Sequence, residues 1–191
     1  MLLLSLKKMI KYFENNKILY AALGFTALFF IYVTFILGSV SSCFTLDIGS
    51  NSLGLSFSYT KDIVQNFFEV RNQEQLLCYI QFLKIWDAVF ALVYTLMYAS
   101  WIMYFFQNKP LFLVIPIFSM IADWAENYIE LLMLKNYLNS NLISETLVVL
   151  GSRINSFKWI LSSCTYLLIF FGIIIILKKF LIKSKLPKKV V

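Results

Sequence analysis

The chain has 191 residues, of which 60% are hydrophobic and 14% are charged, and its mean hydropathy is +0.77. This composition excludes an ordinary soluble domain and indicates an integral membrane protein. The net charge of +7 does not indicate nucleic-acid binding, because the lysines concentrate at the two ends of the chain; the absence of histidine removes the usual ligand of haem and zinc.

Four apolar stretches are each long enough to cross a bilayer, which takes about 20 residues. We expect the spans near residues 18–39, 76–106, 111–134 and 154–177. The second stretch is longer than one span needs, so it should tilt or protrude. The expected fold is all-α, a four-helix transmembrane bundle formed by residues 1–191 as a single domain.

The lysines predict how this bundle is oriented. Residues 1–17 and 178–191 form basic tails, and Lys109 lies in the short link between the second and third spans. The long link after the first span carries more acidic than basic residues. By the positive-inside rule both tails are cytoplasmic and residues 40–75 lie outside, and we expect the plasma (inner) membrane. The basic tail should also attract anionic lipid, so membrane lipid is an expected partner and nucleic acid is not.

The outer segment between the first and second spans should contain a short amphipathic helix. Thr60 is a typical N-cap residue, and an apolar face follows it at helical spacing. The residues of this face are Ile63, Val64, Phe67 and Phe68. Such a helix lies on or near the outer interface and can lead directly into the second span.

The chain has three cysteines. Cys43 follows the first span and Cys78 lies near the start of the second, both on the expected outer side. They either form a disulfide, which an oxidising compartment permits, or remain two small unpaired apolar side chains. Cys164 lies within the fourth span and is expected to pack inside the bundle.

The third span carries three carboxylates on one helical face. Its polar stripe recurs at i+3 and i+4 steps and consists of Pro116, Ser119, Asp123, Glu126, Asn127 and Glu130. A carboxylate in hydrocarbon costs roughly 2.5–3.5 kcal/mol even on the lenient insertion scale, so these groups must be sheltered and paired. An ionisable cluster inside a membrane is therefore the candidate functional site.

Two further spans should turn polar stripes toward this one in the outer half of the bundle. The stripe of the fourth span is Gly151, Asn155, Lys158, Ser162 and Thr165. The stripe of the second span is Lys84, Asp87, Tyr94 and Tyr98. The first span is less polar and is expected to serve as a lid or packing partner. The tryptophans beside the stripes are expected to be interfacial belt residues: Trp86, Trp124 and Trp159.

Depth and charge suggest a role for each ionisable residue. Asp123 and Glu126 lie deepest and are the expected catalytic acid–base residues. Lys158 should neutralise Glu126 or Asp87, and because acids outnumber Lys84 and Lys158, one or two carboxyl groups should retain a proton. The expected binding residues are Asp87, Tyr94, Asn127, Glu130 and Lys158. Alternatively, Glu130 is simply solvated, or the whole cluster consists of interhelical anchors that fix the bundle.

These motifs resemble those of a family of small, largely uncharacterised four-span membrane proteins. The residues that carry the resemblance are Asp-x-x-Glu-Asn at 123–127, the acid Asp87, and Phe157-Lys158-Trp159. The similarity covers roughly residues 60–177. It implies the four-span fold and its topology, and it implies no particular activity.

Three functions remain open. The leading one is a small membrane-embedded enzyme or binding protein for a lipid-like substrate, working by carboxylate acid–base chemistry without a cofactor or metal. The second is a proton- or cation-coupled carrier, which four spans would build as a homodimer. The third is an assembly subunit of a membrane complex. An enclosed pocket favours the first, a polar track through the bundle the second, and an outward-facing stripe the third.

Overall fold

The computed structural model describes residues 2–46, 52–107 and 109–185, and every structural statement below concerns these residues. They form helices and connecting loops, with no strand among them. Four helical segments are long and apolar enough to cross a membrane: Lys17–Ser41, Gln73–Phe105, Pro110–Ser140 and Glu145–Lys178. The prediction of an all-α bundle with four spans is therefore confirmed.

Each span is built from one or more helical elements. The first contains α1 (Leu2–Ile31), the π-helical turn η1 (Tyr32–Leu37) and α2 (Gly38–Ser41). The second contains α4 (Gln73–Gln81), the π-helical turn η3 (Phe82–Asp87) and α5 (Ala88–Phe105). The third contains the 3-10 turn η4 (Pro110–Leu113) and α6 (Val114–Ser140), and the fourth is α7 (Glu145–Lys185). Between the first two spans lie η2 (Leu53–Leu55) and α3 (Lys61–Glu69).

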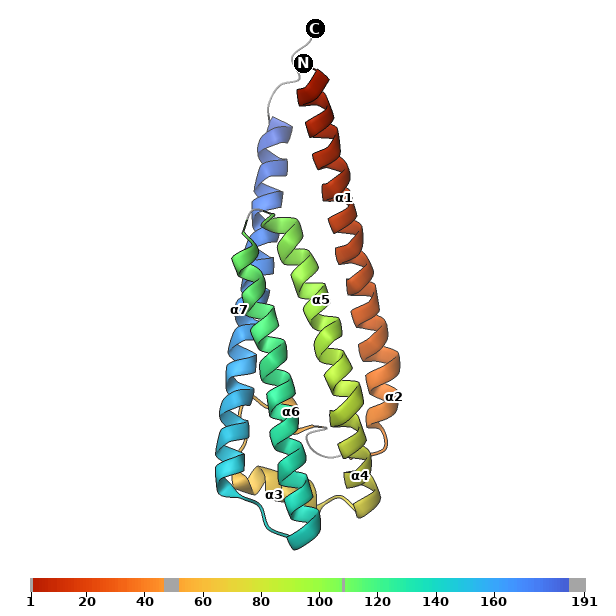
Figure 1. The fold of residues 1–191 in the computed structure, drawn as a ribbon, viewed down its shortest axis with the longest axis vertical. Coiled ribbons are helices and arrows are strands. Elements are labelled where there is room, and N and C mark those ends of the chain that lie inside the picture. Colours follow the sequence, from red (N-terminus) through yellow and green to blue (C-terminus); the bar gives the residue numbers. More distant parts are fainter. Residues whose placement is uncertain (1, 47–51, 108, 186–191) are drawn as a thin grey trace.

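The two ends of the bundle differ. The helix α1 begins and α7 ends at one end, which we call the terminal end (Figure 1). The short helix α3 lies across the opposite end, which we call the capped end (Figure 1). The far ends of the basic tails, at residues 1 and 186–191, and residues 47–51 of the long link lie outside the described residues.

Side-chain caps set the helix starts at the capped end. The Thr60 hydroxyl accepts a hydrogen bond from the Ile63 amide at 3.4 Å, which confirms the expected start of α3. Asn72 and Gln75 form a reciprocal capping box that starts α4 anew. The amphipathic helix therefore does not run directly into the second span. Pro110 occupies the first turn of η4, as its fixed φ favours.

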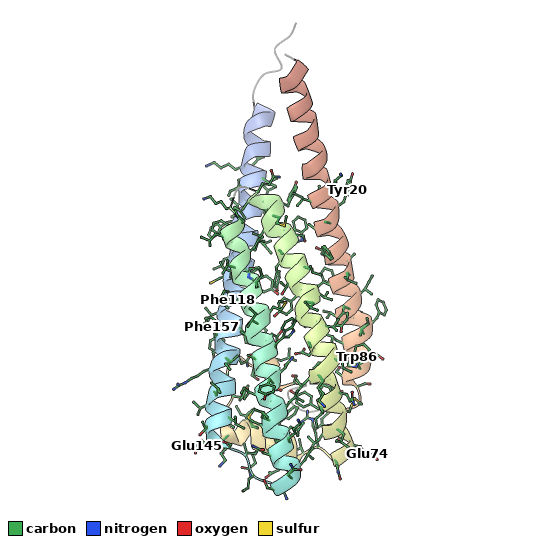
Figure 2. All side chains as sticks on the ribbon, viewed as in Figure 1. Tyr20, Glu74, Trp86, Phe118, Glu145 and Phe157 are labelled. Carbon is green, nitrogen blue, oxygen red and sulfur yellow. A yellow bond between two sulfur atoms is a disulfide. The ribbon has the colours of Figure 1, made fainter. Side chains whose placement is uncertain are left out.

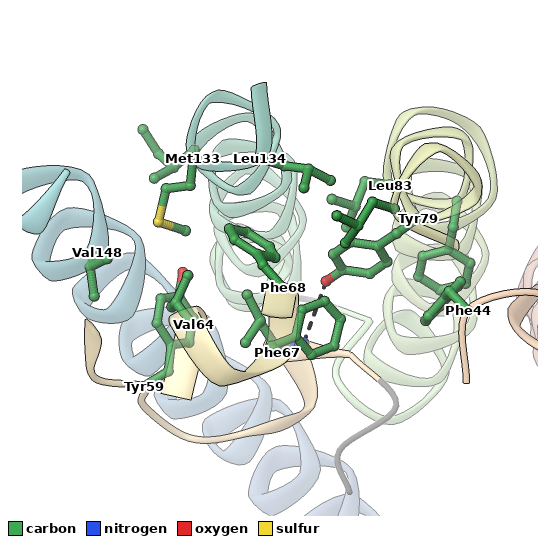
Figure 3. Packing of buried hydrophobic residues seen from close by; sticks show 14 residues of the cluster. Phe44, Tyr59, Val64, Phe67, Phe68, Tyr79, Leu83, Met133, Leu134 and Val148 are labelled. Carbon is green, nitrogen blue, oxygen red and sulfur yellow. Dashed lines mark hydrogen bonds between the residues drawn. The ribbon is translucent and has the colours of Figure 1, made fainter. Parts of the chain in front are cut away.

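The amphipathic helix α3 packs its apolar face against the bundle and forms the part of the hydrophobic core at the capped end. Val64, Phe67 and Phe68 of α3 are buried together with Tyr79 from α4 and Met133 from α6 (Figure 3). Ile63, expected on the same face, is instead 44% exposed, because the buried face is narrower than the sequence pattern. The helix α3 thereby covers the capped end, which would otherwise be an open ring of helix ends.

The first span lies against the second. The helix α1 packs along α5 and makes few contacts with α7. The Trp101 indole donates to Thr26 Oγ1 at 2.8 Å, and the Tyr32 hydroxyl donates to the Trp86 carbonyl at 2.8 Å. These bonds use the few polar groups of the first span, in agreement with its expected role as a packing partner.

The outer surface of the bundle is apolar along its middle. Phe118 and Phe157 point away from the helices and are 51% and 50% exposed (Figure 2). Glu74 and Glu145 lie near the capped end, beyond this apolar region (Figure 2). Large exposed aromatic side chains between charged ends are typical of a surface that contacts lipid.

A disulfide joins the first two spans at the capped end. Cys43 and Cys78 are bonded, with their Cα atoms 6.3 Å apart, so the bridged alternative is the one that the structure contains. Cys164 is a free thiol on the exposed surface of α7. The expectation that it packs inside the bundle is wrong, because its position falls off the inward stripe of that helix.

Candidate functional site

The polar stripe of the third span faces the interior of the bundle. All six of its residues are buried: Pro116, Ser119, Asp123, Glu126, Asn127 and Glu130. Glu126 is fully buried and Glu130 is 1% exposed. The alternative that Glu130 is solvated near the surface is therefore wrong, because the capped end covers it.

Lys158 is the centre of the cluster. Its ammonium group donates to Asp123 Oδ1 at 3.2 Å, to Glu126 Oε2, and to the carbonyl of Gly54 at 3.3 Å. The pairing with Glu126 was expected, and the pairing with Asp123 was not. Asp87, the other expected partner, forms no ion pair with Lys158. An ammonium group has three hydrogens, so these three acceptors occupy all of them.

The carbonyl of Gly54 comes from the long link, which sequence reasoning did not place at the site. It also accepts a 3.1 Å hydrogen bond from the Trp159 indole. A Cβ atom at position 54 would lie 3.3 Å from both Glu126 Oε1 and Lys158 Nζ, so a residue without a side chain allows this close approach. Trp159 is therefore a site residue, a role that its expected place in the interfacial belt did not indicate.

The link reaches the cluster because side chains of α7 hold it there. Asn155 Nδ2 donates to the Ser56 carbonyl at 2.5 Å, and Ser156 donates to the Phe57 carbonyl at 2.9 Å. Ser152 accepts from the Tyr59 amide at 3.0 Å. An apolar span with several hydrogen-bonding side chains on one face needs partners for them, and this feature of the sequence could have predicted that the link packs against α7.

Two neutral side chains orient the aspartates. The Tyr94 hydroxyl donates to Asp123 Oδ2 at 3.0 Å. Asn127 Nδ2 donates to Asp87 Oδ2 at 2.9 Å. The expected binding residues Tyr94, Asn127 and Asp87 therefore form two hydrogen-bonded pairs, one of which includes Asp123, where the inward faces of η3 and α5 meet that of α6.

A second network covers Glu130. The Tyr79 hydroxyl donates to Glu130 Oε2 at 2.5 Å and lies 3.1 Å from Ser52 Oγ. The Leu53 amide donates to the same Tyr79 oxygen at 3.4 Å. Sequence reasoning assigned no role to Tyr79 or Ser52, because the residues that meet here are 26 and 51 positions apart in the chain.

Glu126 and Glu130 connect these two networks. They lie four residues apart on α6 and are therefore neighbours on one face of the helix. The Oε1 atom of each is buried and receives no N–H or O–H donor from the described residues. One proton shared between the two carboxyl groups would satisfy both oxygens and reduce the repulsion between them.

Lys84 is not part of the cluster. It is exposed, and it forms no ion pair within the described residues. In an α-helix Lys84 and Asp87 would share a face, but both belong to the π-helical turn η3, whose wider i→i+5 pattern separates them. Within the described residues, the four acids Asp87, Asp123, Glu126 and Glu130 are therefore balanced by one lysine rather than two.

Tyr59 packs beside the cluster, and its side chain accounts for the glycine at position 151 of the α7 stripe. Its hydroxyl is buried without a hydrogen-bond partner among the described residues, and it occupies the space that a Cβ at Gly151 would need. Burial raises the pKa of the Tyr59 phenol, and the charges of Glu130 and Glu126 raise it further. Gly151 therefore provides room rather than polarity.

A cavity of about 350 Å³ lies beside the cluster. Its polar wall includes Asp87, Asp123, Lys158 and Tyr94, whereas Glu126, Asn127 and Glu130 are not among its lining residues. Aromatic and aliphatic side chains from the first, second and fourth spans and from the long link form the other walls. Because α1 and α7 make few contacts with each other, the cavity lies where the bundle is least closed.

Among the described residues, no three His, Cys, Asp or Glu side chains are placed to hold one metal ion. Comparisons with protein-family models, with curated proteins and with solved structures find no match for this chain. The resemblance to small four-span membrane proteins therefore remains a prediction.

Proposed function

We propose that this integral membrane protein binds an amphiphilic, lipid-like molecule in the cavity between α1 and α7. The observation that carries the proposal is the cavity of about 350 Å³ within the spans, with ionisable groups on one wall and apolar groups on the others. Small-molecule sites commonly combine an apolar lining with a few polar groups that fix orientation. An amphiphile likewise has a polar headgroup and an apolar chain, which match the polar and apolar walls of the cavity.

The size of the cavity supports an amphiphile rather than a wholly enclosed ligand. Its volume is at the lower end of the range of about 300–1,000 Å³ found for small-molecule sites. It can hold a headgroup and the first part of an apolar chain. The remainder of the chain can pass between α1 and α7 into the bilayer, where these helices make few contacts.

The polar wall supports acid–base chemistry on the bound molecule as a more specific form of this function. Asp87 and Asp123 both line the cavity, so both can exchange a proton with a bound headgroup. Of the two residues expected to be catalytic, Asp123 is the one that can touch a ligand. Glu126 lies behind Lys158, and we assign it the role of a positioning residue that holds the lysine.

The other two functions have less support. Toward the terminal end, polar contacts among the described residues continue from Asp123 only as far as Ser119 and Ser162, whose hydroxyl oxygens are 2.8 Å apart; beyond them Gly172 packs against the ring of Phe105. A carrier would need polar groups to continue in that direction as well. A docking stripe for an assembly partner would face outward, and the stripe of α6 is buried.

The disulfide supports the proposed orientation in the membrane. Disulfides persist in oxidising compartments, and the bond between Cys43 and Cys78 is at the capped end. This agrees with the distribution of lysines, which places the basic tails in the cytoplasm. We therefore place the cavity in the outer half of the membrane, with the capped end outside.

Two glycines of the first span allow a matched test. Gly38 lines the cavity, and a Cβ there would meet only the Val33 carbonyl at 3.9 Å; a Cβ at Gly24 would meet nothing within 4 Å. Native mass spectrometry of protein purified from membranes should find a bound amphiphile in wild type and in Gly24→Phe. The Gly38→Phe variant, whose ring fills the cavity, should lose it. Equal occupancy in all three proteins, or no amphiphile in any of them, would contradict the proposal.

A further inference from the structure

We infer that the amphiphile in this cavity carries a positively charged, hydrogen-bond-donating headgroup, such as a primary ammonium, rather than an anionic phosphate or carboxylate. The inference rests on the proposed function, because it names the class of molecule that the cavity accepts. It follows from which groups on the polar wall are already satisfied and which are open.

The lysine on the wall cannot readily serve an anion. All three hydrogens of the Lys158 ammonium are directed to protein acceptors, namely Asp123, Glu126 and the Gly54 carbonyl. An anionic headgroup would have to displace one of these acceptors. It would then leave a buried carboxylate or a buried carbonyl without its donor, which is unfavourable in a low dielectric.

The open group on the wall is an acceptor. Asp87 Oδ2 receives the Asn127 amide, and Asp87 Oδ1 has no hydrogen-bond partner among the described residues although the side chain lines the cavity. An ionised carboxylate only accepts hydrogen bonds. The unused oxygen therefore selects a ligand that donates, and a charged donor forms the stronger bond.

The balance of charge points in the same direction. Within the described residues, the cluster contains four acids and one lysine, and Asp87 and Asp123 are the acids that reach the cavity. A bound cation reduces the excess negative charge, whereas a bound anion increases it. The wall of the cavity also includes the rings of Phe90 and Trp159, and aromatic rings favour cations over anions.

Ligands with one chain and different headgroups test the inference. Dodecylamine, dodecanol and dodecyl phosphate share an apolar chain, and each can be titrated into the purified protein in nanodiscs, with occupancy measured by native mass spectrometry. We expect dodecylamine to bind about 10-fold more tightly than either of the others, the difference expected for a charged hydrogen bond. Gly38→Phe should abolish the saturable binding of all three and so identifies binding in the cavity.

A pair of matched variants assigns the preference to one carboxylate. Asp87→Asn keeps the shape of the side chain and removes its charge, and it should weaken dodecylamine binding about 10-fold and dodecanol binding by a smaller factor. Asp62→Asn changes an exposed carboxylate of α3 and should change neither. Retention of the amine preference in Asp87→Asn would overturn the inference.

The outcomes separate this inference from the proposed function. Equal affinities for the three ligands, or tighter binding of dodecyl phosphate, would overturn the headgroup assignment. If Gly38→Phe still abolished that binding, the cavity would remain an amphiphile site. Absence of saturable binding by any of the three ligands would overturn both the site and its headgroup.

Discussion

The hydroxyl of Tyr79 on α4 donates a 2.5 Å hydrogen bond to Glu130 Oε2 on α6, and both side chains are fully enclosed by protein. The ring of Tyr79 packs between those of Phe44 and Phe67, with centroids 4.8 and 4.9 Å away. A carboxyl group near the end of a span is thereby sealed from water by an aromatic core. The bond thus links two spans, and it involves the acidic residue of the cluster that lies nearest the capped end.

Replacement of Tyr79 by phenylalanine should destabilise the protein by about 1–3 kcal/mol, because Glu130 Oε2 then loses its donor while remaining buried. Tyr59→Phe is the matched control, since its hydroxyl has no partner among the described residues, and it should be neutral or stabilising. The free energy of unfolding of each variant in mixed micelles measures the difference. Equal losses in the two variants would show that the Tyr79 bond contributes nothing specific.

Lys158→Met should be strongly destabilising, by about 3–5 kcal/mol, because it leaves two buried carboxylates without their cation. Lys84→Met removes an exposed lysine of another span and should change stability by less than about 0.5 kcal/mol. Adding Asp123→Asn and Glu126→Gln to Lys158→Met should recover much of the loss. Unfolding of Lys158→Met at the wild-type denaturant concentration would rule out the ion-pair cluster.

Gly151→Ala should destabilise the protein by about 1–3 kcal/mol, because the added methyl group would collide with the Tyr59 hydroxyl and lie 3.0 Å from Ile129 Cγ2. Gly24→Ala, also within a helix but in open space, should be neutral or stabilising. Thermal unfolding compares the two. Combining Gly151→Ala with Tyr59→Phe should recover part of the loss, and a double variant no more stable than Gly151→Ala would argue against the Tyr59 contact.

Loss of the disulfide should reduce stability by about 3–4 kcal/mol, the chain-entropy value for residues 35 positions apart. The experiment compares the double substitution Cys43→Ser and Cys78→Ser with Cys164→Ser, which removes the free thiol. Denaturant unfolding should separate the first variant from wild type and leave the second unchanged. Equal stability under reducing and non-reducing conditions for the wild-type protein would contradict the prediction.

The orientation in the membrane can be tested by labelling in intact cells. In a Cys164→Ser background, a cysteine replacing Ile63, which is exposed on α3, should react with a membrane-impermeant maleimide. A cysteine replacing Ser5 in the basic N-terminal tail should react only after the cells are permeabilised. The reverse pattern would invert the proposed topology and place the cavity in the inner half of the membrane.

Helical periodicity accounts for what could be predicted of this site. The i+3 and i+4 spacing predicts that the stripes of α6 and α7 face each other, and Lys158 meets Glu126 and Asp123 there, although only the pairing with Glu126 was expected. Lys84 was misplaced because the same rule fails across a π-helical turn, which leaves no clear mark in the residue pattern. Periodicity was therefore reliable within regular helices and misleading at η3.

Contacts made by the long link could not be read from any local pattern. The Gly54 carbonyl reaches Lys158 across 104 positions of the chain, and the position of Gly54 in a loop predicts a turn rather than a contact. Tyr79 was overlooked for a similar reason, since a tyrosine at the start of a span normally suggests an interfacial residue. Such contacts depend on the packing of the whole bundle, and only the surplus of hydrogen-bonding side chains on α7 indicated them.

The π-helical turns η1 and η3 lie beside each other, joined by the bond from Tyr32 to the Trp86 carbonyl. Each holds more residues than an α-helical turn of the same rise. A deletion of one residue within η3 could therefore be absorbed by a change from π-helical to α-helical geometry, with the segments before and after it close to their present orientation. The same deletion within the regular helix α5 would rotate one part of the span by about 100° relative to the other. During divergence, changes in the length of this span are therefore best tolerated at the π-helical turn.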